Sequence, residues 1–229
     1  DYCITGISEN KFESLFPSAM KKGKKFEVFE LDGREFALAR SEKKTGIGHK
    51  NFKTICDSKI TIEEDLGRRD ITINSIAKDI LTGKLIDPYN GKKDLQNHII
   101  RATTQYFKDD PLRAYRAARF SAKFNFKIDP DTLKLMNELK PELISLPKER
   151  VFEELRKAIN TDYPELFFYN LKEADILDVH FIEIYKLIGA LQPEKYHPEG
   201  DAYNHSILAL KKSAEITKDE KIRFSALVH

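Results

Sequence analysis

Cysteine is scarce in this chain of 229 residues, and the two cysteines that occur, Cys3 and Cys56, show no paired spacing. Small secreted domains that depend on disulfides carry several cysteines at regular intervals. The scarcity therefore excludes a disulfide framework and indicates a reducing compartment, so we expect the protein in the cytoplasm. We interpret Cys56 as a small buried hydrophobic side chain near the end of a strand.

Long apolar runs are absent as well. No stretch approaches the roughly 20 apolar residues that cross a bilayer, and no signal-peptide pattern opens the chain, so we expect no membrane partner. The first residue is not Met, the chain begins inside the apolar run 2–4, and it stops at His229 within a helical pattern. We therefore expect an internal piece of a longer protein.

Charge of one sign is in small excess, because 39 Lys and Arg against 37 Asp and Glu give a net charge of +2. This balance argues against a non-specific polycation, although a basic stripe on one face would not appear in a net count. Charged residues still make up 33% of the chain, above the usual quarter. The length allows one large domain or several small ones.

The first third of the chain has the pattern of a small mixed sheet. Residues 26–31 and 35–40 have strand character and flank Asp32-Gly33, a typical hairpin turn. A further strand is predicted to close on Gly6.

A helix is predicted between these strands. Ser8 is a suitable N-cap, and Phe12, Leu15 and Phe16 are expected to share one face.

After Arg101 the pattern changes to helical periods with short breaks. Asp110 is a good N-cap, and Pro111 suits the first helical position. The predicted helices cover residues 111–126, 131–140, 147–160, 164–174, 182–191 and 201 onward. The chain is therefore predicted to be α+β, with a small mixed or antiparallel sheet head followed by helices.

The stretch "GRRDITINSIAKD" places Arg68, Arg69 and Asp70 directly before an apolar pattern that begins at Ile71. One interpretation is a solvated turn before a strand or helix. The other is a charged rim that holds an anion or a sugar, with Ile71, Ile73 and Ile76 anchoring it to the core.

A second charged row recurs every third residue, at Arg113, Arg116 and Arg119, and Asp110 stands at its start. Three helical steps return to nearly the same side, so these like charges repel one another on one face. A solvated arginine face is the simple interpretation. The alternative is a site for an anion such as a triphosphate, which suits the planar guanidinium. Leu112, Tyr115, Ala118 and Ala122 form the companion apolar stripe.

Carboxylates near strands and histidines near helices are the other chemical features. Asp1 opens the first strand and Glu35 opens the second arm of the hairpin, and clustered carboxylates are what two-metal phosphoryl transfer requires. Each alone is typical of a surface residue. His205 shares a helix face with Asp201, and it meets His229 if two antiparallel helices pack; exposed or internally satisfied histidines are the alternative.

Four blocks occur in a fixed order: "LGRRDITINSIA", "LIDPYNGKKDLQNHIIRA", "FKDDPLRAYRAARFSAKFNF" and "PKERVFEELRKAI". Together they resemble the class II tRNA nucleotidyltransferase (CCA-adding enzyme) and bacterial poly(A) polymerase superfamily. The stretches "REFALARSEKKTGIGHKNF" and "HPEGDAYNHS" with "RFSALVH" resemble the bacterial members that carry an HD-type phosphohydrolase domain. The resemblance implies an Mg²⁺-dependent nucleotidyltransferase that adds CMP and AMP, from CTP and ATP, to the 3′ end of tRNA without a template.

The resemblance also implies roles for single residues. Asp1 would be the second of two metal-binding aspartates, the first lying upstream, and Glu35 matches a third acidic position. Arg68, Arg69 and Asp70, with Asn74, match the motif that handles the ribose and triphosphate.

The arginine row matches a second functional motif. Asp110 and Arg113 match the pair that reads the incoming base, and Arg116 and Arg119 continue the row toward phosphate. Asp109 stands where the family usually has Glu, a shortening by one methylene.

The resemblance further divides the chain. Residues 87–91 match a hinge, and Glu149 and Arg150 match a block that supports the neck helix. His205 and His229 match the first two metal positions of an HD site, which implies a second divalent metal; the Asp expected after His229 is not in the sequence. The implied domains are a head (1–101), a neck (102–140), a helical body (141–192) and the start of an HD-type domain (193–229).

Three other functions stay open. A poly(A) polymerase or an enzyme that adds only C or only A uses the same chemistry, although the balanced charge and the HD-like tail favour CCA addition. A metal-dependent HD phosphohydrolase is a different reaction class. A non-catalytic RNA-binding module is the third alternative, if the upstream aspartates are missing.

Overall fold

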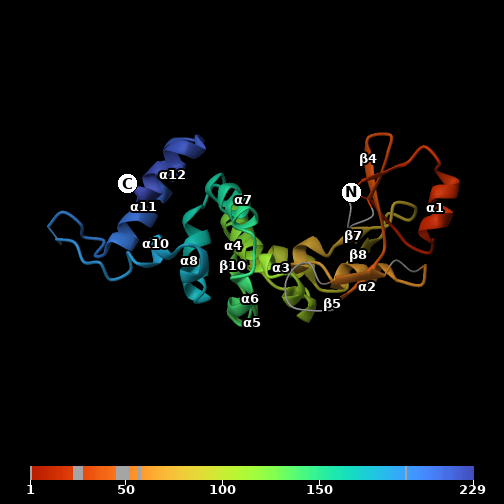
Figure 1. The fold of residues 1–229 in the computed structure, drawn as a ribbon, viewed down its shortest axis with the longest axis horizontal. Coiled ribbons are helices and arrows are strands. Elements are labelled where there is room, and N and C mark those ends of the chain that lie inside the picture. The colour runs from red at the N-terminus through yellow and green to blue at the C-terminus, as the bar shows by residue number, and fades with distance from the viewer. Residues whose placement is uncertain (1, 23–27, 45–51, 56–57, 194) are drawn as a thin grey trace.

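The computed structural model describes residues 2–22, 28–44, 52–55, 58–193 and 195–229, with only the backbone for 41–44 and 52–55. Asp1 and Cys56 lie outside the described residues. The chain is elongated, with strands gathered at the end that holds the N-terminus and helices forming the rest (Figure 1). The predicted α+β class is confirmed.

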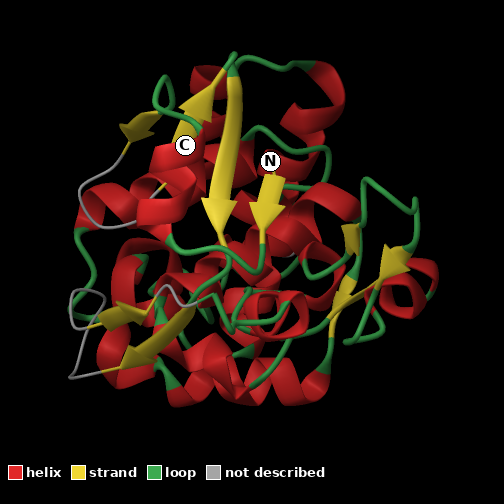
Figure 2. Ribbon diagram, turned by 90° about the vertical axis from the view of Figure 1, so that its right-hand side faces the viewer, coloured by secondary structure: helices red, strands yellow, loops and turns green. Residues whose placement is uncertain are grey.

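The head contains a four-stranded sheet in the order β1-β4-β3-β2, which lies in front of the helices when the molecule is seen from the head end (Figure 2). Its strands are β1 (Tyr2–Ile4), β2 (Met20–Lys22), β3 (Val28–Leu31) and β4 (Arg34–Leu38). β1 runs parallel to β4 and the other pairs are antiparallel, so the sheet is mixed as predicted. Asp32 (φ 50°) and Gly33 (φ 71°) both adopt the positive φ that a tight hairpin turn requires.

Helix α1 (Glu9–Leu15) packs on this sheet through Phe12, which forms a small core with Phe29 and Leu38. As predicted, Phe16 lies beside Phe12, with ring centroids 4.9 Å apart, but Leu15 and Phe16 stay 53% and 41% exposed. The helix ends at Leu15, and Phe16 at its C-cap adopts non-helical dihedrals (φ −127°, ψ 67°).

Short elements connect the head to the helical part. They are β5 (Ser41–Lys44), β6 (Phe52–Ile55), α2 (Ile62–Gly67), η1 (Thr72–Asn74), β7 (Ala77–Lys78), β8 (Leu85–Ile86), α3 (Gly91–Gln96), β9 (Ile99–Ile100) and η2 (Gln105–Asp109). Helix α2 begins with a capping box, in which Thr61 accepts from the amide of Glu64 and Glu64 accepts from the amide of Thr61. The apolar pattern after Asp70 forms the 3-10 turn η1, with Ile71 fully buried and Ile73 packed against the core.

Gly91 is needed where α3 begins. A Cβ on Gly91 would lie 2.2 Å from the carbonyl oxygen of Thr72 and 2.8 Å from Cγ1 of Ile76. The carboxylate of Asp87 accepts hydrogen bonds from the amides of Gly91 (2.7 Å) and Lys92 (2.9 Å). The block 87–91 therefore forms a compact turn that presses α3 against η1.

The helical part is built around α4. Its elements are α4 (Leu112–Phe124), β10 (Lys127–Ile128), α5 (Pro130–Glu138), α6 (Lys140–Leu143), α7 (Lys148–Ile159), α8 (Glu165–Glu173), α9 (Leu177–His180), α10 (Ile182–Tyr185), α11 (Ala202–Ile216) and α12 (Glu220–Val228). The predicted apolar stripe of α4 is buried throughout: Leu112, Tyr115, Ala118 and Ala122 are at most 6% exposed. Helices α7 and α8 pack against this stripe.

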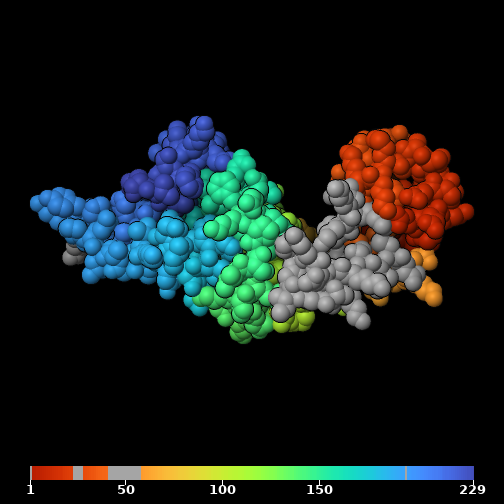
Figure 3. All heavy atoms as spheres, viewed as in Figure 1, coloured from red at the N-terminus to blue at the C-terminus, as the bar shows by residue number. Residues whose placement is uncertain are grey.

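One hydrophobic core runs through this whole part, from Ile71 to Leu227. The predicted borders between neck, body and HD-type domain therefore lie within one continuous core. The division into these domains stays a proposal. Figure 3 shows the surface of the head at one end of the molecule and that of the helical part extending to the other.

One helix prediction needs correction. The helix predicted for 182–191 is limited to α10, because the amides of Leu187 and Ile188 bond carbonyls three residues back, not four, and Gly189 then adopts a φ of 77°. The helical pattern from 201 onward forms two helices, α11 and α12, as the predicted meeting of His205 and His229 requires, and Asp219 caps the second. In the described part of the chain, no helix combines the length and apolar character that a membrane crossing requires.

Candidate nucleotide and metal sites

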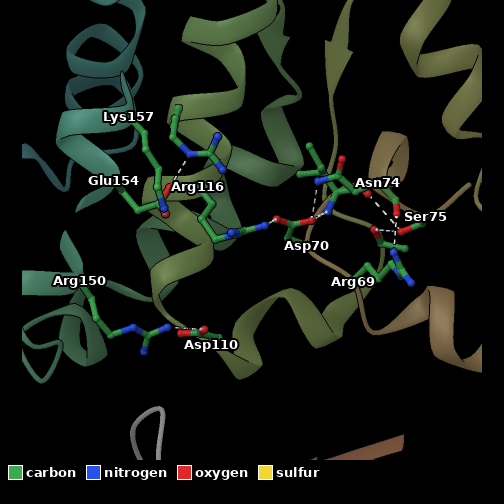
Figure 4. A network of polar contacts seen from close by, with 12 residues as sticks. Arg69, Asp70, Asn74, Ser75, Asp110, Arg116, Arg150, Glu154 and Lys157 are labelled. Atoms are coloured by element: carbon green, nitrogen blue, oxygen red, sulfur yellow. Dashed lines mark hydrogen bonds and ion pairs between the residues drawn. The ribbon is translucent and has the colours of Figure 1, made fainter. Parts of the chain in front are cut away.

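The buried carboxylate of Asp70 joins the head to α4 (Figure 4). Its Oδ2 accepts from Nε of Arg116 at 2.8 Å and lies 2.6 Å from Nη2 of the same guanidinium. Its Oδ1 accepts from the amide of Ile71 (2.9 Å) and from Nδ2 of Asn74 (3.0 Å). Burial alone would raise the pKa of Asp70, but the charge of Arg116 and these hydrogen bonds hold it below its ordinary value.

Arg69 and Asn74 complete a closed network on the head side of Asp70. Nη1 of Arg69 donates to the carbonyl of Asn74 at 3.4 Å, while Ser75 and Thr103 share a hydrogen bond of 2.9 Å between their hydroxyls. Nε of Arg69 is buried and has no hydrogen-bond partner within the described part of the chain. A buried donor in this state is suited to an acceptor from a ligand.

A residue that the sequence analysis missed, Asp65, fixes both arginines of the rim. It is 1% exposed and lies one helical turn before them. Its Oδ1 is 2.8 Å from Nη2 of Arg68, and its Oδ2 is 3.5 Å from Nη2 of Arg69. The signal for Asp65 was its spacing of three and four residues, which places opposite charges side by side on a helix.

The rim lies close to β1 and β4, the strands beside which the metal-binding carboxylates are predicted. Burial raises the pKa of the Cys3 thiol on β1 to about 11, with Asp65 adding to the rise and Arg69 opposing it. Tyr2 pairs with Phe36, the residue after Glu35, and the side chain of Glu35 is exposed. The prediction for Asp1 lies outside the described residues.

Asp110 and Arg113 are both engaged at the start of α4. Asp110 accepts from the amide of Leu112 at 3.1 Å through Oδ1, and its Oδ2 is 3.2 Å from Nη2 of Arg150 on α7. Nη1 of Arg113 donates to the carbonyl of Tyr106 at 2.6 Å. The structure thus pairs Arg150 with Asp110, the aspartate predicted to read the base, while Glu149 is exposed.

The arginine row is not a solvated face. Arg116 binds Asp70, and Arg119 donates from Nε to the buried carboxylate of Glu154 on α7 at 2.5 Å. Lys157 lies 3.4 Å from the other oxygen of Glu154. The repulsion expected along the row is therefore relieved by carboxylates from the head and from α7.

A separate cluster of histidines lies where α11 meets the end of α12. Nε2 of His205 and Nε2 of His229 are 3.0 Å apart, as the prediction of two packed antiparallel helices requires. Glu199 contacts Nδ1 of His205 and lies 3.2 Å from Nδ1 of His197. Ligand atoms of His197, Glu199 and His205 lie within 4.8 Å of one another, close enough to hold a metal ion.

Asp201 does not take the role that its spacing suggested. Its carboxylate caps α11 by accepting from the amide of Asn204 (2.9 Å) and also accepts from the amide of Gly189 (2.8 Å). Glu199, two residues earlier in the loop, reaches His205 instead. The sequence analysis missed Glu199 because a loop residue has no helical spacing to reveal it.

Two family descriptions match the chain. Residues 4–101 match "Poly A polymerase head domain", and residues 125–187 match "Probable RNA and SrmB-binding site of polymerase A".

Two curated relatives align with all of the chain. The multifunctional CCA protein of Shewanella denitrificans is 42% identical over 236 residues, and that of Nitrosococcus oceani is 44% identical over 233 residues. The chain spans 56% and 57% of their respective lengths.

Solved structures share the fold. The CCA-adding enzyme of Bacillus stearothermophilus in complex with CTP has a TM-score of 0.63 at 23% identity, covering 98% of this chain and 55% of that one. A tRNA nucleotidyltransferase complexed with a primer tRNA and an ATP analogue has a TM-score of 0.63 at 22% identity, covering 99% and 65%. The chain belongs to the class II CCA-adding enzyme and poly(A) polymerase family.

Proposed function

We propose that the protein adds CMP and AMP, without a template, to the 3′ end of tRNA, with CTP and ATP as substrates. Support comes from relatives named multifunctional CCA proteins and from structural neighbours with CTP or with a primer tRNA. The observation that carries the proposal is the Asp70–Arg116 ion pair, which joins the charged rim to the helix that starts beside Asp110.

In this proposal Arg68 and Arg69 hold the ribose and triphosphate. Guanidinium groups bind phosphate oxygens in pairs, and Asp65 orients both side chains. The unpaired Nε of Arg69 supplies a further donor. Arg116 and Arg119 continue the row toward the phosphates. Their ion pairs with Asp70 and Glu154 hold the two guanidinium groups in position.

Asp110 and Arg113 read the base. Cytosine N4 and adenine N6 donate to a carboxylate, while cytosine N3 and O2 or adenine N1 accept from a guanidinium. Uracil and guanine reverse this pattern and would leave polar groups unpaired. The hydrogen bond from Leu112 and the ion pair with Arg150 keep the carboxylate of Asp110 in one orientation for this contact.

Enzymes of this family use a divalent metal, and we propose Mg²⁺ on Asp1 and Glu35. Carboxylate oxygens are ligands that Mg²⁺ prefers, and Glu35 is an exposed carboxylate next to the β1–β4 pairing. When bound, Mg²⁺ lowers the pKa of the attacking hydroxyl and holds the departing pyrophosphate. The described residues orient the base and the triphosphate for that attack.

The test is incorporation by the full-length protein on tRNA that lacks its terminal triplet. We expect CMP incorporation with CTP alone and completion of the triplet only when ATP is also present. Absence of CTP incorporation would contradict CCA addition. Long tails of A with ATP alone would indicate a poly(A) polymerase, and incorporation of a single nucleotide type would indicate a partial enzyme.

A metal-dependent phosphohydrolase site on His205 and His229 is the second candidate function. Nδ1 of His229 is 2.8 Å from the carbonyl of Ala226, which only accepts. Nδ1 of His205 faces the Glu199 carboxylate, so when both rings are neutral the two Nε2 atoms carry lone pairs that face each other at 3.0 Å. A cation between them removes this repulsion, and two neutral imidazoles are common ligands of divalent metals.

The remaining assignments are also proposals. We keep the head (1–101), neck (102–140), body (141–192) and HD-type start (193–229) as functional units. A tRNA-processing role supports the cytoplasm as the compartment in which the protein acts.

A further inference from the structure

We propose that Glu199 is a positioning residue for a divalent-metal site on His205 and His229. This role rests on the second site proposed above. Glu199 lies in the loop before α11 and contacts neither the charged rim nor the start of α4 in the described structure.

The carboxylate of Glu199 sets the tautomer of His205. A carboxylate only accepts, so the imidazole must carry its proton on Nδ1, the nitrogen in contact with Glu199. Nε2 then presents a lone pair toward Nε2 of His229, 3.0 Å away. Without Glu199, His205 is free to place its proton on Nε2 or to turn its ring, and either change removes a metal ligand.

Backbone hydrogen bonds of the loop hold Glu199 in place without using the imidazole of His205. Nδ2 of Asn204 donates to the carbonyl of Glu199 at 3.3 Å, and the amide of Gln192 donates to the carbonyl of Gly200 at 3.2 Å. Gly200 has a φ of 99°, a backbone conformation that residues with a side chain rarely adopt. It directly precedes Asp201, the N-cap of α11. The backbone that carries the Glu199 side chain is thus held by contacts other than the one to His205.

His197 contacts the same carboxylate. Its Nδ1 lies 3.2 Å from Oε1 of Glu199, the oxygen that also contacts His205, and the two imidazole rings meet edge to face with centroids 4.8 Å apart. The arrangement of carboxylate, histidine and metal is one that orients a ligand and raises its basicity. Removal of such a carboxylate weakens metal affinity about 10- to 100-fold.

The experiment is a Co²⁺ titration of the full-length protein, followed by its visible absorption bands. We compare the wild type with Glu199→Ala and Glu199→Gln, and Glu183→Ala serves as control because Glu183 is an exposed carboxylate on α10. We expect about 10- to 100-fold weaker Co²⁺ binding for the alanine variant. The glutamine variant should bind more tightly than the alanine variant, because its amide oxygen still accepts from Nδ1 of His205.

The outcomes separate the two proposals. A wild type that does not bind Co²⁺ contradicts the histidine metal site itself. A wild type that binds, with Glu199→Ala binding equally well, overturns the positioning role alone. Glutamine binding no better than alanine also overturns it, since Glu199 would then act as a charged ligand. If circular dichroism shows that the alanine variant does not fold, the glutamine variant decides. A loss of Co²⁺ affinity of less than tenfold relative to the wild type supports the positioning role, and a larger loss contradicts it.

Discussion

Arg116 and Asp70 are 46 residues apart in the sequence, yet Nη2 of the arginine lies 2.6 Å from Oδ2 of the aspartate. The aspartate is 6% exposed, and its other oxygen holds Ile71 and Asn74. One carboxylate therefore fixes both the loop that carries the charged rim and the helix that begins beside Asp110 and carries Arg113. A change at Asp70 is expected to disturb the head and the neck together.

We predict that Asp70→Asn lowers the free energy of unfolding by about 2 kcal/mol at neutral pH, because a charge-assisted hydrogen bond becomes a neutral one. Urea unfolding of the variant and the wild type measures this difference. The native pKa of Asp70 lies below its ordinary value of 3.8. The ionised carboxylate thus stabilises the fold above 3.8, and this stabilisation is lost as the pH falls through the lower native pKa.

The two proteins should therefore converge in stability as the pH falls below 3.8. The asparagine variant has no carboxylate to protonate at this position, so its curve lacks that contribution. A difference that stays constant from pH 7 to pH 2 would show that Asp70 stabilises the fold by shape rather than by charge.

Asp65→Asn should weaken nucleotide binding more than it weakens the fold. The buried carboxylate orients Arg68 and Arg69, and an amide cannot pair with both guanidinium groups. We expect KM for CTP and for ATP to rise about 10-fold, the equivalent of one charged hydrogen bond. Steady-state kinetics on tRNA lacking CCA measure this change.

Glu63→Gln is the matched control for Asp65, because Glu63 lies on the same helix with an exposed side chain. It should leave KM unchanged. An equal rise in both variants would assign the effect to the charge of α2 rather than to the orientation of the arginines.

Arg113→Ala should change which nucleotide is chosen. If Arg113 donates to the base, its loss removes a contact that distinguishes cytosine and adenine from uracil and guanine, so UMP and GMP misincorporation should rise about 10- to 100-fold. Competition assays with pairs of nucleotides measure the ratio of kcat/KM. Lys123→Ala, an exposed cation on the same helix, is the control. Weaker tRNA binding with unchanged nucleotide choice would identify Arg113 as part of an RNA-binding face.

The sequence was a good guide where periodicity decides the structure. The apolar stripe of α4 and the hairpin at Asp32-Gly33 follow from spacing and turn chemistry, and both are confirmed. Spacing placed Phe16 beside Phe12, but it did not show that Leu15 and Phe16 stay exposed, because the end of α1 depends on backbone dihedrals at its C-cap. It failed again at 182–191, where Gly189 adopts a positive φ.

The candidate site was predictable in its charged residues but not in their partners. The sequence placed Arg116 and Arg119 on one face, and only the fold shows that Asp70 and Glu154 receive them. Such pairs are set by how the head and α7 pack on α4. No local sequence pattern indicates this packing, so residue spacing cannot predict ion pairs between residues that are distant in the sequence.

Arg223 gives the last prediction, since this fully buried cation is bound by carbonyl oxygens. Its guanidinium donates at 2.7 to 3.0 Å to four carbonyls, those of Ile159, Thr161, Ala214 and Thr217. They lie at the C-terminal ends of α7 and α11, where unpaired carbonyls and the helix dipole favour a cation.

Arg223→Lys should therefore lower the free energy of unfolding by about 3 kcal/mol, because a single ammonium cannot reach all four carbonyls and buried acceptors are left unsatisfied. Denaturant unfolding measures the loss, and Lys221→Ala, an exposed neighbour on α12, should stay within about 0.5 kcal/mol of the wild type. His229 directly follows the last residue of α12, so a displaced α12 would move it. We therefore expect Co²⁺ affinity to fall in the Arg223 variant. A lysine variant as stable as the wild type would mean that water replaces the guanidinium and that the apolar contacts and the Arg156–Glu220 ion pair suffice to hold α7, α11 and α12 together.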